Sequence, residues 1–472
     1  MSIPAPSPFA AVVIGGGISG LACGFRLQQT GIPARILESG ARPGGLISTT
    51  EKDGFHFDLG PQSFLSTEPL LKLIDSLGLK DQLLHADAGA PRYILSKGKL
   101  TPAPLAPPSL LTSPLLGLAT KWRIFTEMLH RTRPPEDDES IAAFIRRKFG
   151  SELLDQLVAP FVSGVYAGDP EKLSLRASFP KLHEFETNYG SVLRGAMKSR
   201  SPKGVPRAGL CSFRDGMQTL PRALAARMGD MLLMEARVCA LHRGKANGKP
   251  WFEIEFMRHD HRETIAANAV VLATPTDIAS EILKGLSDQF SAAFAPIRYA
   301  PVAVVSAGYR RDQFSRPVNG FGFLVPRGEK LRVLGTVWNS SLFPGRAPEN
   351  MVCLTSFAGG ATDPGLCSLS DAEISETICA EVAKVLGVSG PPAITHVQRY
   401  PRALPQYNLG HSRAVATLGE VVSAIPGLFL AGNYLSGPSI GACVEQAHQT
   451  ADAVRVYLAS IVALGAGAVA HA

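Results

Sequence analysis

Three glycines and a glutamate near the N-terminus have the spacing of a dinucleotide-binding site. Gly15, Gly17 and Gly20 follow the apolar run 10–14, and Glu38 ends a second apolar run. In this pattern the first glycine permits a tight turn, the second lets the backbone approach a pyrophosphate, and the third allows close helix–strand packing. A glutamate about 20 residues further on accepts hydrogen bonds from ribose hydroxyls, which disfavours NADP. The residues expected to bind here are Gly15, Gly16, Gly17, Ile18, Ser19, Gly20, Glu38 and Ser39.

These residues need a strand, a helix and a second strand to hold them in place. The run 10–14 predicts the first strand, and Ala22 and Phe25 continue with helical spacing. A Gly-Ile-Pro sequence at 31–33 ends that helix, and the run 34–37 predicts the second strand. The free N–H groups at the start of the helix then face the pyrophosphate.

The overall composition narrows the class of protein. A chain of 472 residues is too long for one hydrophobic core, so two or three domains are expected. The net charge of +7 comes from scattered lysines and arginines, which suits an anionic small molecule or membrane surface and argues against nucleic acid. The seven cysteines are dispersed without a CxxC pair. This indicates a reducing, cytoplasmic compartment and argues against disulfides or a metal site.

A second glycine-containing segment indicates which dinucleotide is bound. Arg42 precedes Gly44 and Gly45, and a strand with a Gly-Pro turn follows at 57–62. The first resembles the RxGG element of flavoproteins with two dinucleotide-binding domains, and the second resembles the segment beneath their isoalloxazine ring. The resemblance implies FAD as the cofactor. It also implies FAD contacts at Arg42, Gly45, Gly60, Pro61, Gln62, Ser63, Val238, Gly432, Asn433, Pro438, Ser439 and Ile440.

The middle of the chain predicts a second sheet. Four strand-like runs follow one another, and a helix at 371–386 is expected to pack on them. Such a succession suggests a mostly antiparallel sheet. A last helix is expected at 441–458, and its start suits the flavin end of FAD. The four runs are 303–309, 321–325, 331–338 and 351–357.

A helical insert is expected between the nucleotide-binding segments. Five prolines between residues 101 and 120 prevent a continuous helix in an apolar stretch. That stretch is expected to line a hydrophobic cavity or enter a bilayer surface, with a buried linker as the alternative. Helical patterning resumes at 121–130 and again after 140.

The expected fold is α/β: a two-dinucleotide-binding-domain FAD fold with a mostly antiparallel substrate-domain sheet and a helical, membrane-associated insert. The FAD-binding domain is discontinuous. The expected boundaries are 1–85, 206–290 and 410–472 for the FAD-binding domain, 86–110 and 291–409 for the substrate-binding domain, and 111–205 for the insert.

Several longer motifs resemble one family within the flavin amine oxidase superfamily. The segment 160–170 reads PFVSGVYAGDP, and 320–326 reads GFGFLVP. These resemble signatures of the oxygen-dependent protoporphyrinogen/coproporphyrinogen oxidase family. Further matching segments lie at 334–344, 403–407, 410–411 and 431–434.

The resemblance implies a substrate site. Arg92 matches an arginine that pairs with a substrate propionate, and Gly164 matches a glycine close to a pyrrole. Gln62 stands where some members have a basic residue, which puts a second anion anchor in doubt.

Four apolar residues complete the implied substrate site. Leu324 and Leu334 match an aliphatic pair on either side of one ring, and Phe357 matches a stacking aromatic. Phe321 is a further candidate. For each of these side chains, core packing is the alternative role.

The implied reaction converts a porphyrinogen to a porphyrin in heme biosynthesis, with hydride transfer to FAD, dioxygen as acceptor and peroxide as product. The flavin carries this chemistry, so no catalytic side chain and no metal are expected. Protoporphyrinogen IX and coproporphyrinogen III remain alternatives, as do an amine or carotenoid-type substrate and a non-enzymatic flavoprotein. The expected location is cytoplasmic and peripheral, on the inner face of the cell membrane.

Overall fold

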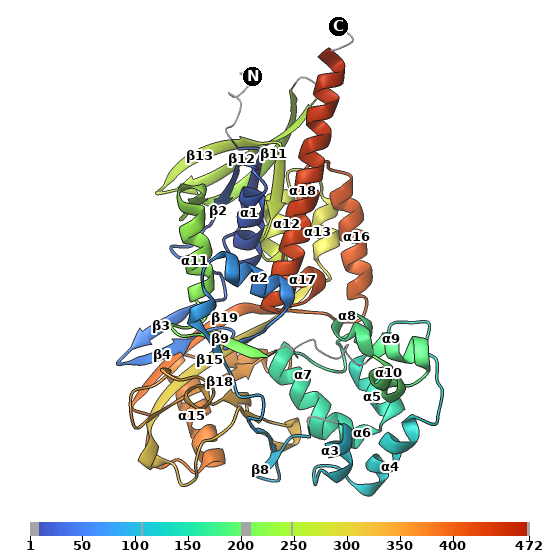
Figure 1. Cartoon of the computed structure of the whole chain (residues 1–472), viewed down its shortest axis with the longest axis vertical. Helices are drawn as coiled ribbons and strands as arrows, with labels where there is room; N and C mark the ends of the chain where they lie inside the picture. The colour runs from blue at the N-terminus through green and yellow to red at the C-terminus, as the bar shows by residue number, and fades with distance from the viewer. Residues whose placement is uncertain (1–8, 105–106, 200–208, 247–248, 470–472) are drawn as a thin grey trace.

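A five-stranded parallel sheet carries the first dinucleotide-binding segment. The computed structural model describes residues 9–104, 107–199, 209–246 and 249–469. The central strand of the sheet, β1, comes directly before Gly15. The strands come from the beginning, middle and end of the chain and lie together in the upper half of Figure 1. In sheet order they are β10 (Leu232–Leu233), β2 (Ala34–Leu37), β1 (Ala11–Ile14), β14 (Ala269–Leu272) and β20 (Leu428–Leu430).

Both faces of this sheet are covered, which explains why β1 is apolar at every position. Val13 points into a core shared with α1 (Ile18–Gln29) and α18 (Ile440–Val469). Val12 points into the opposite core, which also contains residues of the sheet β11–β12–β13. The three strands of that sheet are β11 (Arg237–Ala246), β12 (Lys249–Arg258) and β13 (His261–Ala267).

A seven-stranded sheet forms the second layer system, at the opposite end of the molecule from the C-terminus (Figure 1). Every neighbouring pair is antiparallel except β7 and β16, which are parallel. The order is β19 (Ile394–Gln406), β15 (Arg298–Arg310), β18 (Met351–Gly359), β17 (Val333–Val337), β16 (Gly322–Leu324), β7 (Arg92–Ser96) and β8 (Lys99–Pro102).

The edge strand β19 is not among the four predicted strands. Pro401 and Pro405 interrupt its pattern, and proline is tolerated in edge strands because one side needs no hydrogen bond. The register of β19 against β15 shifts between Ala300 and Val302, opposite the first of these prolines. The helix α15 (Asp371–Leu386) has the predicted bounds.

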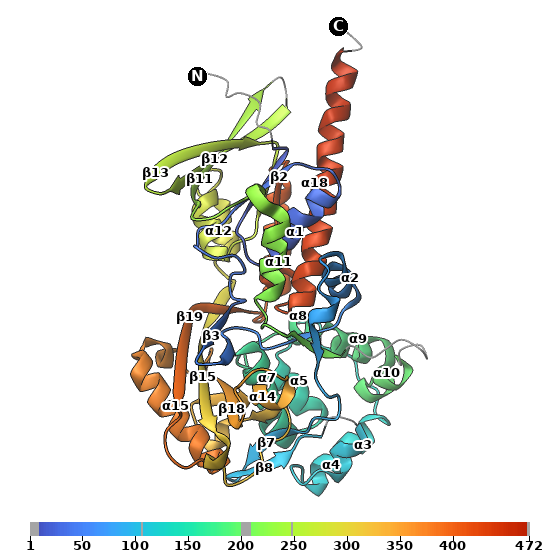
Figure 2. The ribbon, with the colours of Figure 1, turned by 60° about the vertical axis from the view of Figure 1, so that its left-hand side comes forward.

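Short helices form the insert, which lies beside the seven-stranded sheet (Figure 2). Among the described residues of the proline-rich stretch, α3 stops before Pro114, and Leu115 and Leu116 are buried in the core of the insert. The predicted end of the insert at 205 lies outside the described residues. Its main helices are α3 (Pro107–Thr112), α4 (Leu118–Glu127), α5 (Ile141–Lys148), α7 (Ala159–Tyr166), α9 (Pro180–Tyr189) and α10 (Val192–Lys198).

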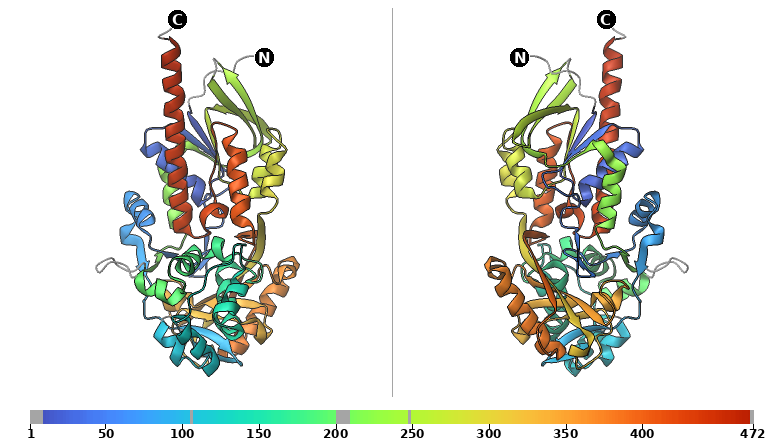
Figure 3. Two further views of the ribbon diagram at one scale, coloured as in Figure 1. Left: turned by 90° about the vertical axis from the view of Figure 1, so that its right-hand side faces the viewer. Right: turned by 90° about the vertical axis from the view of Figure 1, so that its left-hand side faces the viewer.

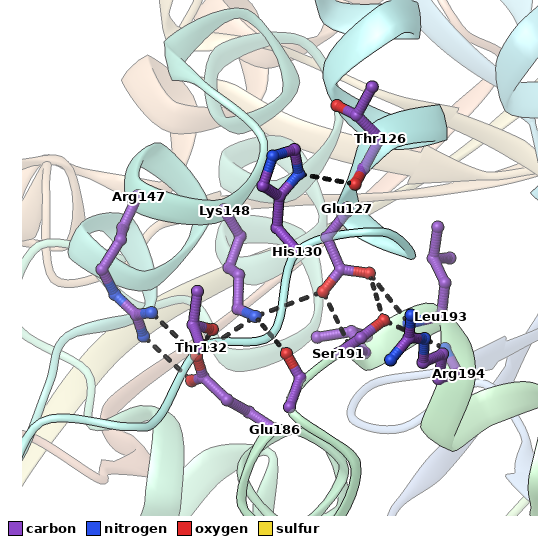
Figure 4. A network of polar contacts seen from close by, with 12 residues as sticks. Thr126, Glu127, His130, Thr132, Arg147, Lys148, Glu186, Ser191, Leu193 and Arg194 are labelled. Carbon is purple, nitrogen blue, oxygen red and sulfur yellow. Dashed lines mark hydrogen bonds and ion pairs between the residues drawn. The ribbon is translucent and has the colours of Figure 1, made fainter.

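A buried ionic network joins four of these helices (Figure 4). Lys148 of α5 lies 3.2 Å from Oε1 of Glu127 on α4 and 3.1 Å from Oε1 of Glu186 on α9. Arg147 donates to both oxygens of Glu186. Glu127 also accepts from the hydroxyl of Ser191, which caps α10. Because Lys148, Glu127 and Glu186 are buried and paired, the helices are fixed relative to one another.

The final helix α18 extends further than predicted, to Val469 rather than 458. Its end projects beyond the parallel sheet in both views of Figure 3. Within the ranges that the structure describes, no helix is both long and apolar enough to cross a bilayer.

Candidate cofactor and substrate site

The first glycine-rich turn has the geometry that its sequence predicts. Gly15 has φ of +109°, and a Cβ there would lie 2.6 Å from the carbonyl oxygen of Ala273. A Cβ on Gly20 would lie 1.9 Å from the carbonyl oxygen of Gly15, so only glycine allows this close packing. By contrast, a Cβ on Gly17 would meet no atom within 4 Å. The turn is therefore tight on one side and open at Gly17, where a pyrophosphate would approach.

Glu38 is turned toward this turn from the end of β2. Its Oε2 accepts from the backbone N–H of Gly16 at 2.5 Å, and its Oε1 accepts from Gly40 at 2.6 Å. The exposed Ser39 hydroxyl also donates to Glu38, at 3.4 Å. A carboxylate has about four lone-pair sites, so acceptor capacity remains for ribose hydroxyls. Val238 packs at the edge of the neighbouring core.

The Arg42 segment is attached to the same turn. The N–H of Gly44 donates to the carbonyl of Gly16 at 2.8 Å, and Gly44 forms a bridge with Gly17. The guanidinium of Arg42 donates to the carbonyl of Gly45 at 2.9 Å. Arg42 thus orders its own turn, and a direct contact with the dinucleotide stays a prediction.

The Gly-Pro turn after β4 (Phe55–Asp58) packs on this segment. A Cβ on Gly60 would lie 2.0 Å from the carbonyl oxygen of Leu46. Pro61 and Ser63 are half-buried, and Gln62 is buried between them. The Gln62 amide nitrogen donates to the carbonyls of Asp58 and Gly60, at 2.7 and 2.8 Å.

Gln62 has no N–H left for an anionic substrate, because both are used by backbone carbonyls. Its oxygen accepts from the amide of Asn339 at 2.5 Å. The sequence raised doubt that this position binds a second carboxylate of the substrate, and the geometry of Gln62 supports that doubt. The sequence did not predict that Asn339 bonds to Gln62, because 277 residues separate the two in the chain.

The second helix N-terminus approaches the first. In the turn after β20, the N–H of Gly432 donates to Gln446 at 3.2 Å, and Asn433 begins the short helix α17 (Asn433–Ser436). Pro438 and Ser439 precede α18, and the Ser439 hydroxyl accepts from Ala442 at 3.2 Å. The first residue of α18, Ile440, is buried.

Cys443 connects the starts of α18 and α1. Its thiol is hydrogen-bonded to the side chain of Ser19, in the first turn of α1. Burial raises the pKa of Cys443 to about 11, so this thiol is a neutral packing group. Two helix N-termini therefore open toward one space, which suits a dinucleotide with two phosphates. The open face at Gly17 and these paired helix ends fit FAD.

The structure brings four of the six expected substrate residues into two contacting pairs. The guanidinium of Arg92 lies 5.0 Å from the centre of the Phe321 ring. A Cβ on Gly164 would lie 2.4 Å from Cδ2 of Leu324, so α7 touches β16 closely at this point. The two pairs are adjacent because Arg92 lies opposite Gly322, two residues before Leu324.

Leu334 and Phe357 form a third group nearby. Both are half-buried and, together with Tyr400, pack against a buried cluster that includes Ala167, directly after α7. Leu324 lies opposite Gly335, and Gly335 lies opposite Phe357, so β17 joins the two groups. Direct contact of these side chains with a substrate stays a prediction.

A parallel sheet with two helix N-termini over its glycine-rich turns, combined with a second, mostly antiparallel sheet, is typical of a dinucleotide-binding flavoprotein. The family model for flavin containing amine oxidoreductases matches residues 18–455. The chain belongs to this family. It is an FAD-dependent oxidoreductase, which confirms the cofactor expected from the sequence.

Individual relatives narrow the comparison. Protoporphyrinogen oxidase 1, chloroplastic, from Arabidopsis thaliana is 34% identical, over 95% of this chain and 88% of the relative. Coproporphyrinogen III oxidase from Bacillus subtilis is 28% identical, over 95% and 98% respectively. A crystal structure from Exiguobacterium sp. 255-15 shares the fold with a TM-score of 0.80 and 24% identity, covering 95% of this chain and 99% of that one.

Proposed function

We propose that the protein oxidises a porphyrinogen to the porphyrin with FAD, as a step of heme biosynthesis. The relatives named above act on protoporphyrinogen or on coproporphyrinogen III, and this chain matches both over nearly its whole length. The observation that carries the proposal is the grouping of Arg92, Phe321, Leu324 and Gly164 where α7 meets β16. This grouping places one cation beside an apolar surface, as an amphipathic macrocycle with carboxylates requires.

In this proposal each side chain binds or orients the macrocycle. Arg92 is exposed and forms no ion pair within the described part of the chain, so its guanidinium is available to a propionate. Its planar fork matches a carboxylate in a two-point contact. Leu324, Leu334 and Phe357 supply apolar surface for the rings and keep water away from the reacting carbon.

Bound FAD supplies the hydride acceptor, and the protein contributes position rather than acid–base chemistry. Each two-electron step removes a hydride and a proton from the macrocycle. Dioxygen receives them as peroxide, so three steps consume three molecules of dioxygen. Full conjugation of the product favours the reaction.

The test is an aerobic assay of the FAD-loaded protein with protoporphyrinogen IX and, separately, coproporphyrinogen III. We expect porphyrin fluorescence to rise faster than autoxidation with at least one of them, together with one peroxide for each dioxygen consumed. The faster substrate identifies the physiological one. Porphyrin formation at the autoxidation rate with both would contradict the proposal.

A second part of the proposal concerns α4, which presents one apolar face to solvent. Four residues at helical spacing, three in α4 and Leu129 just after it, are exposed: Leu118 by 85%, Trp122 by 66%, Phe125 by 54% and Leu129 by 67%. The exposed Arg123 lies on the same helix. Apolar side chains beside a cation suit the interface of an anionic bilayer.

We place the protein peripherally on the cytoplasmic face of a membrane, with α4 at the lipid surface. The seven cysteines are all free, which suits a reducing compartment. Attachment at α4 would bring the insert, and with it α7, to the source of a poorly soluble substrate. The apolar face begins at Leu118, near the end of the proline-rich stretch, whereas Leu115 and Leu116 just before it are buried.

A further inference from the structure

The short helix α14 (Asn339–Leu342) lies between two segments. One is residues 58–62, called here the cofactor-facing turn, and the other is the turn at 320–321 that carries Phe321. Trp338 alone separates α14 from β17, and the first three residues of the helix are polar. Each of these reaches a different neighbour. Asn339 donates to Gln62 at 2.5 Å, Ser340 accepts from the N–H of Cys353 at 3.0 Å, and Ser341 accepts from the N–H of Gly320 at 2.9 Å.

The contact with the cofactor side is buried and specific. Asn339 is 1% exposed and Gln62 is 6% exposed. Within the described chain, the Oδ1 of Asn339 has no hydrogen-bond partner. A buried side-chain amide needs a hydrogen-bond partner, and Gln62 is the partner of the Asn339 amide nitrogen.

The hydrogen bond from Gly320 to Ser341 holds a turn whose backbone conformation is restricted to glycine. Gly320 has φ of +130°, and a Cβ there would lie 2.5 Å from the carbonyl oxygen of Pro91. The next residue, Phe321, donates through its N–H to the same carbonyl at 2.8 Å, and its own carbonyl accepts from Trp338 at 2.9 Å. Ser341 therefore fixes the backbone on which Phe321 lies under Arg92.

The loop after α14 adds a second tie to the cofactor side. The buried Arg346 lies 3.3 Å from Oδ2 of Asp58, four residues before Gln62. It also donates to the hydroxyl of Ser212 at 2.7 Å and to the carbonyl of Phe213 at 2.9 Å. The segment 58–62 is thus held at both ends from one loop of the seven-stranded sheet.

We propose that α14 sets the separation between the cofactor-facing turn and the substrate-binding pair Arg92 and Phe321, with Asn339 and Ser341 as positioning residues. The pair is called the clamp here, and this inference rests on the proposed function. Asn339 acts through Gln62 on the cofactor side. Ser341 acts through Gly320 on the substrate side.

The test compares Asn339→Ala and Ser341→Ala with Ser340→Ala, each purified with FAD. Ser340 is the matched control, because it makes the same kind of bond from the same helix to the sheet only. The measurements are kcat and KM for the preferred porphyrinogen, the visible absorption spectrum of the flavin, the FAD content and the Tm.

Asn339→Ala is expected to lower kcat about tenfold with little change in KM and to shift the flavin absorption band, because misplacement of reacting groups lowers the rate. Ser341→Ala is expected to raise KM about fivefold with kcat within about twofold, since one hydrogen bond supports the clamp. Ser340→Ala is expected to lower Tm alone.

Two results would overturn the proposal: equal effects of all three variants on the kinetic constants, or an unchanged flavin spectrum and kcat in Asn339→Ala. If the wild-type protein oxidises neither porphyrinogen, the proposed function fails by itself. The flavin spectra of Asn339→Ala and Ser340→Ala then still decide whether α14 positions the cofactor-facing turn.

Discussion

Arg92 combines an aromatic neighbour with a free charge. Its guanidinium lies over Phe321, and in the described ranges it pairs with no carboxylate. Arg92→Ala is expected to raise KM roughly tenfold or more and to change kcat less, because a charge-assisted bond to the substrate is lost. Arg92→Lys should fall between, since an ammonium lacks the planar fork.

The control for Arg92 is Lys99→Ala, which removes an exposed cation from the adjacent strand β8. Steady-state kinetics with both porphyrinogens measure the effect. Equal KM values in wild type and Arg92→Ala would remove Arg92 from the substrate site.

Gly164 is required by a close contact rather than by backbone freedom. In a helix, alanine is favoured over glycine by about 1 kcal/mol, so Gly164→Ala by itself should stabilise α7. A Cβ there would however lie 2.4 Å from Leu324, so the leucine must move. We expect kcat/KM to fall about tenfold or more, because overpacking displaces a side chain of the site.

A second substitution separates the contact from other effects of Gly164→Ala. The double variant with Leu324→Val removes a methylene at the point of contact and should recover part of the lost kcat/KM. A double variant that is no better than Gly164→Ala would show that the loss does not arise at Leu324.

At the scale of the elements, the helices of the insert are stabilised by the ionised carboxylate of Glu186. Burial raises the pKa of Glu186, but hydrogen bonds from Arg147, Thr132 and Lys148 outweigh this and lower it to about 2, from an ordinary 4.5. A carboxyl group whose pKa is lower in the folded state stabilises the fold at pH values above its pKa in the unfolded state. That stabilisation is lost as pH falls from about 4.5 toward 2.

Glu186→Gln should therefore flatten the dependence of Tm on pH below pH 4.5 and lower Tm at pH 7, because it leaves Lys148 and Arg147 with one anion fewer. Glu171→Gln is the matched control, since Glu171 forms an exposed pair with Arg146. Thermal melts at several pH values give the result. The same slope in Glu186→Gln and wild type would show that this carboxylate does not govern acid unfolding.

The apolar face of α4 predicts binding to anionic vesicles. Replacing Trp122 and Phe125 with serine should reduce co-flotation at least tenfold, because burying each aromatic side chain contributes about 1.5 kcal/mol or more. Val456→Ser with Val462→Ser is the control, as these exposed residues belong to α18, at the far end of the molecule from α4 (Figure 1). Undiminished flotation of the α4 variant would reject this surface.

Local pattern was sufficient for some elements and not for others. The glycine-rich turn and α15 were predicted because their signals are local: glycine spacing in one case and a helical sequence pattern in the other. The edge strand β19 was missed because its prolines read as breaks. The bond between Asn339 and Gln62 has no local signal at all, since it joins residues 277 positions apart.

In the molecule as a whole, the residues expected to bind the cofactor and those expected to bind the substrate lie mainly in different layers. The parallel sheet and its helices carry the glycine-rich turns, whereas the seven-stranded sheet and the insert carry the expected substrate residues. The flavin could be predicted from motifs in the first layer, and the family resemblance came from motifs such as 160–170 and 320–326 in the insert and the seven-stranded sheet. How the two layers meet, through α14, Asp58 and Arg346, required the structure.

The central claim is that a porphyrinogen delivers its electrons to the flavin of this protein. The most direct measurement mixes the FAD-loaded protein with each porphyrinogen without dioxygen and follows flavin absorbance and porphyrin fluorescence together. The account predicts bleaching of the flavin band with matching porphyrin formation, and return of the band when air is admitted. A flavin that stays oxidised with both porphyrinogens but is bleached by an amine would contradict it.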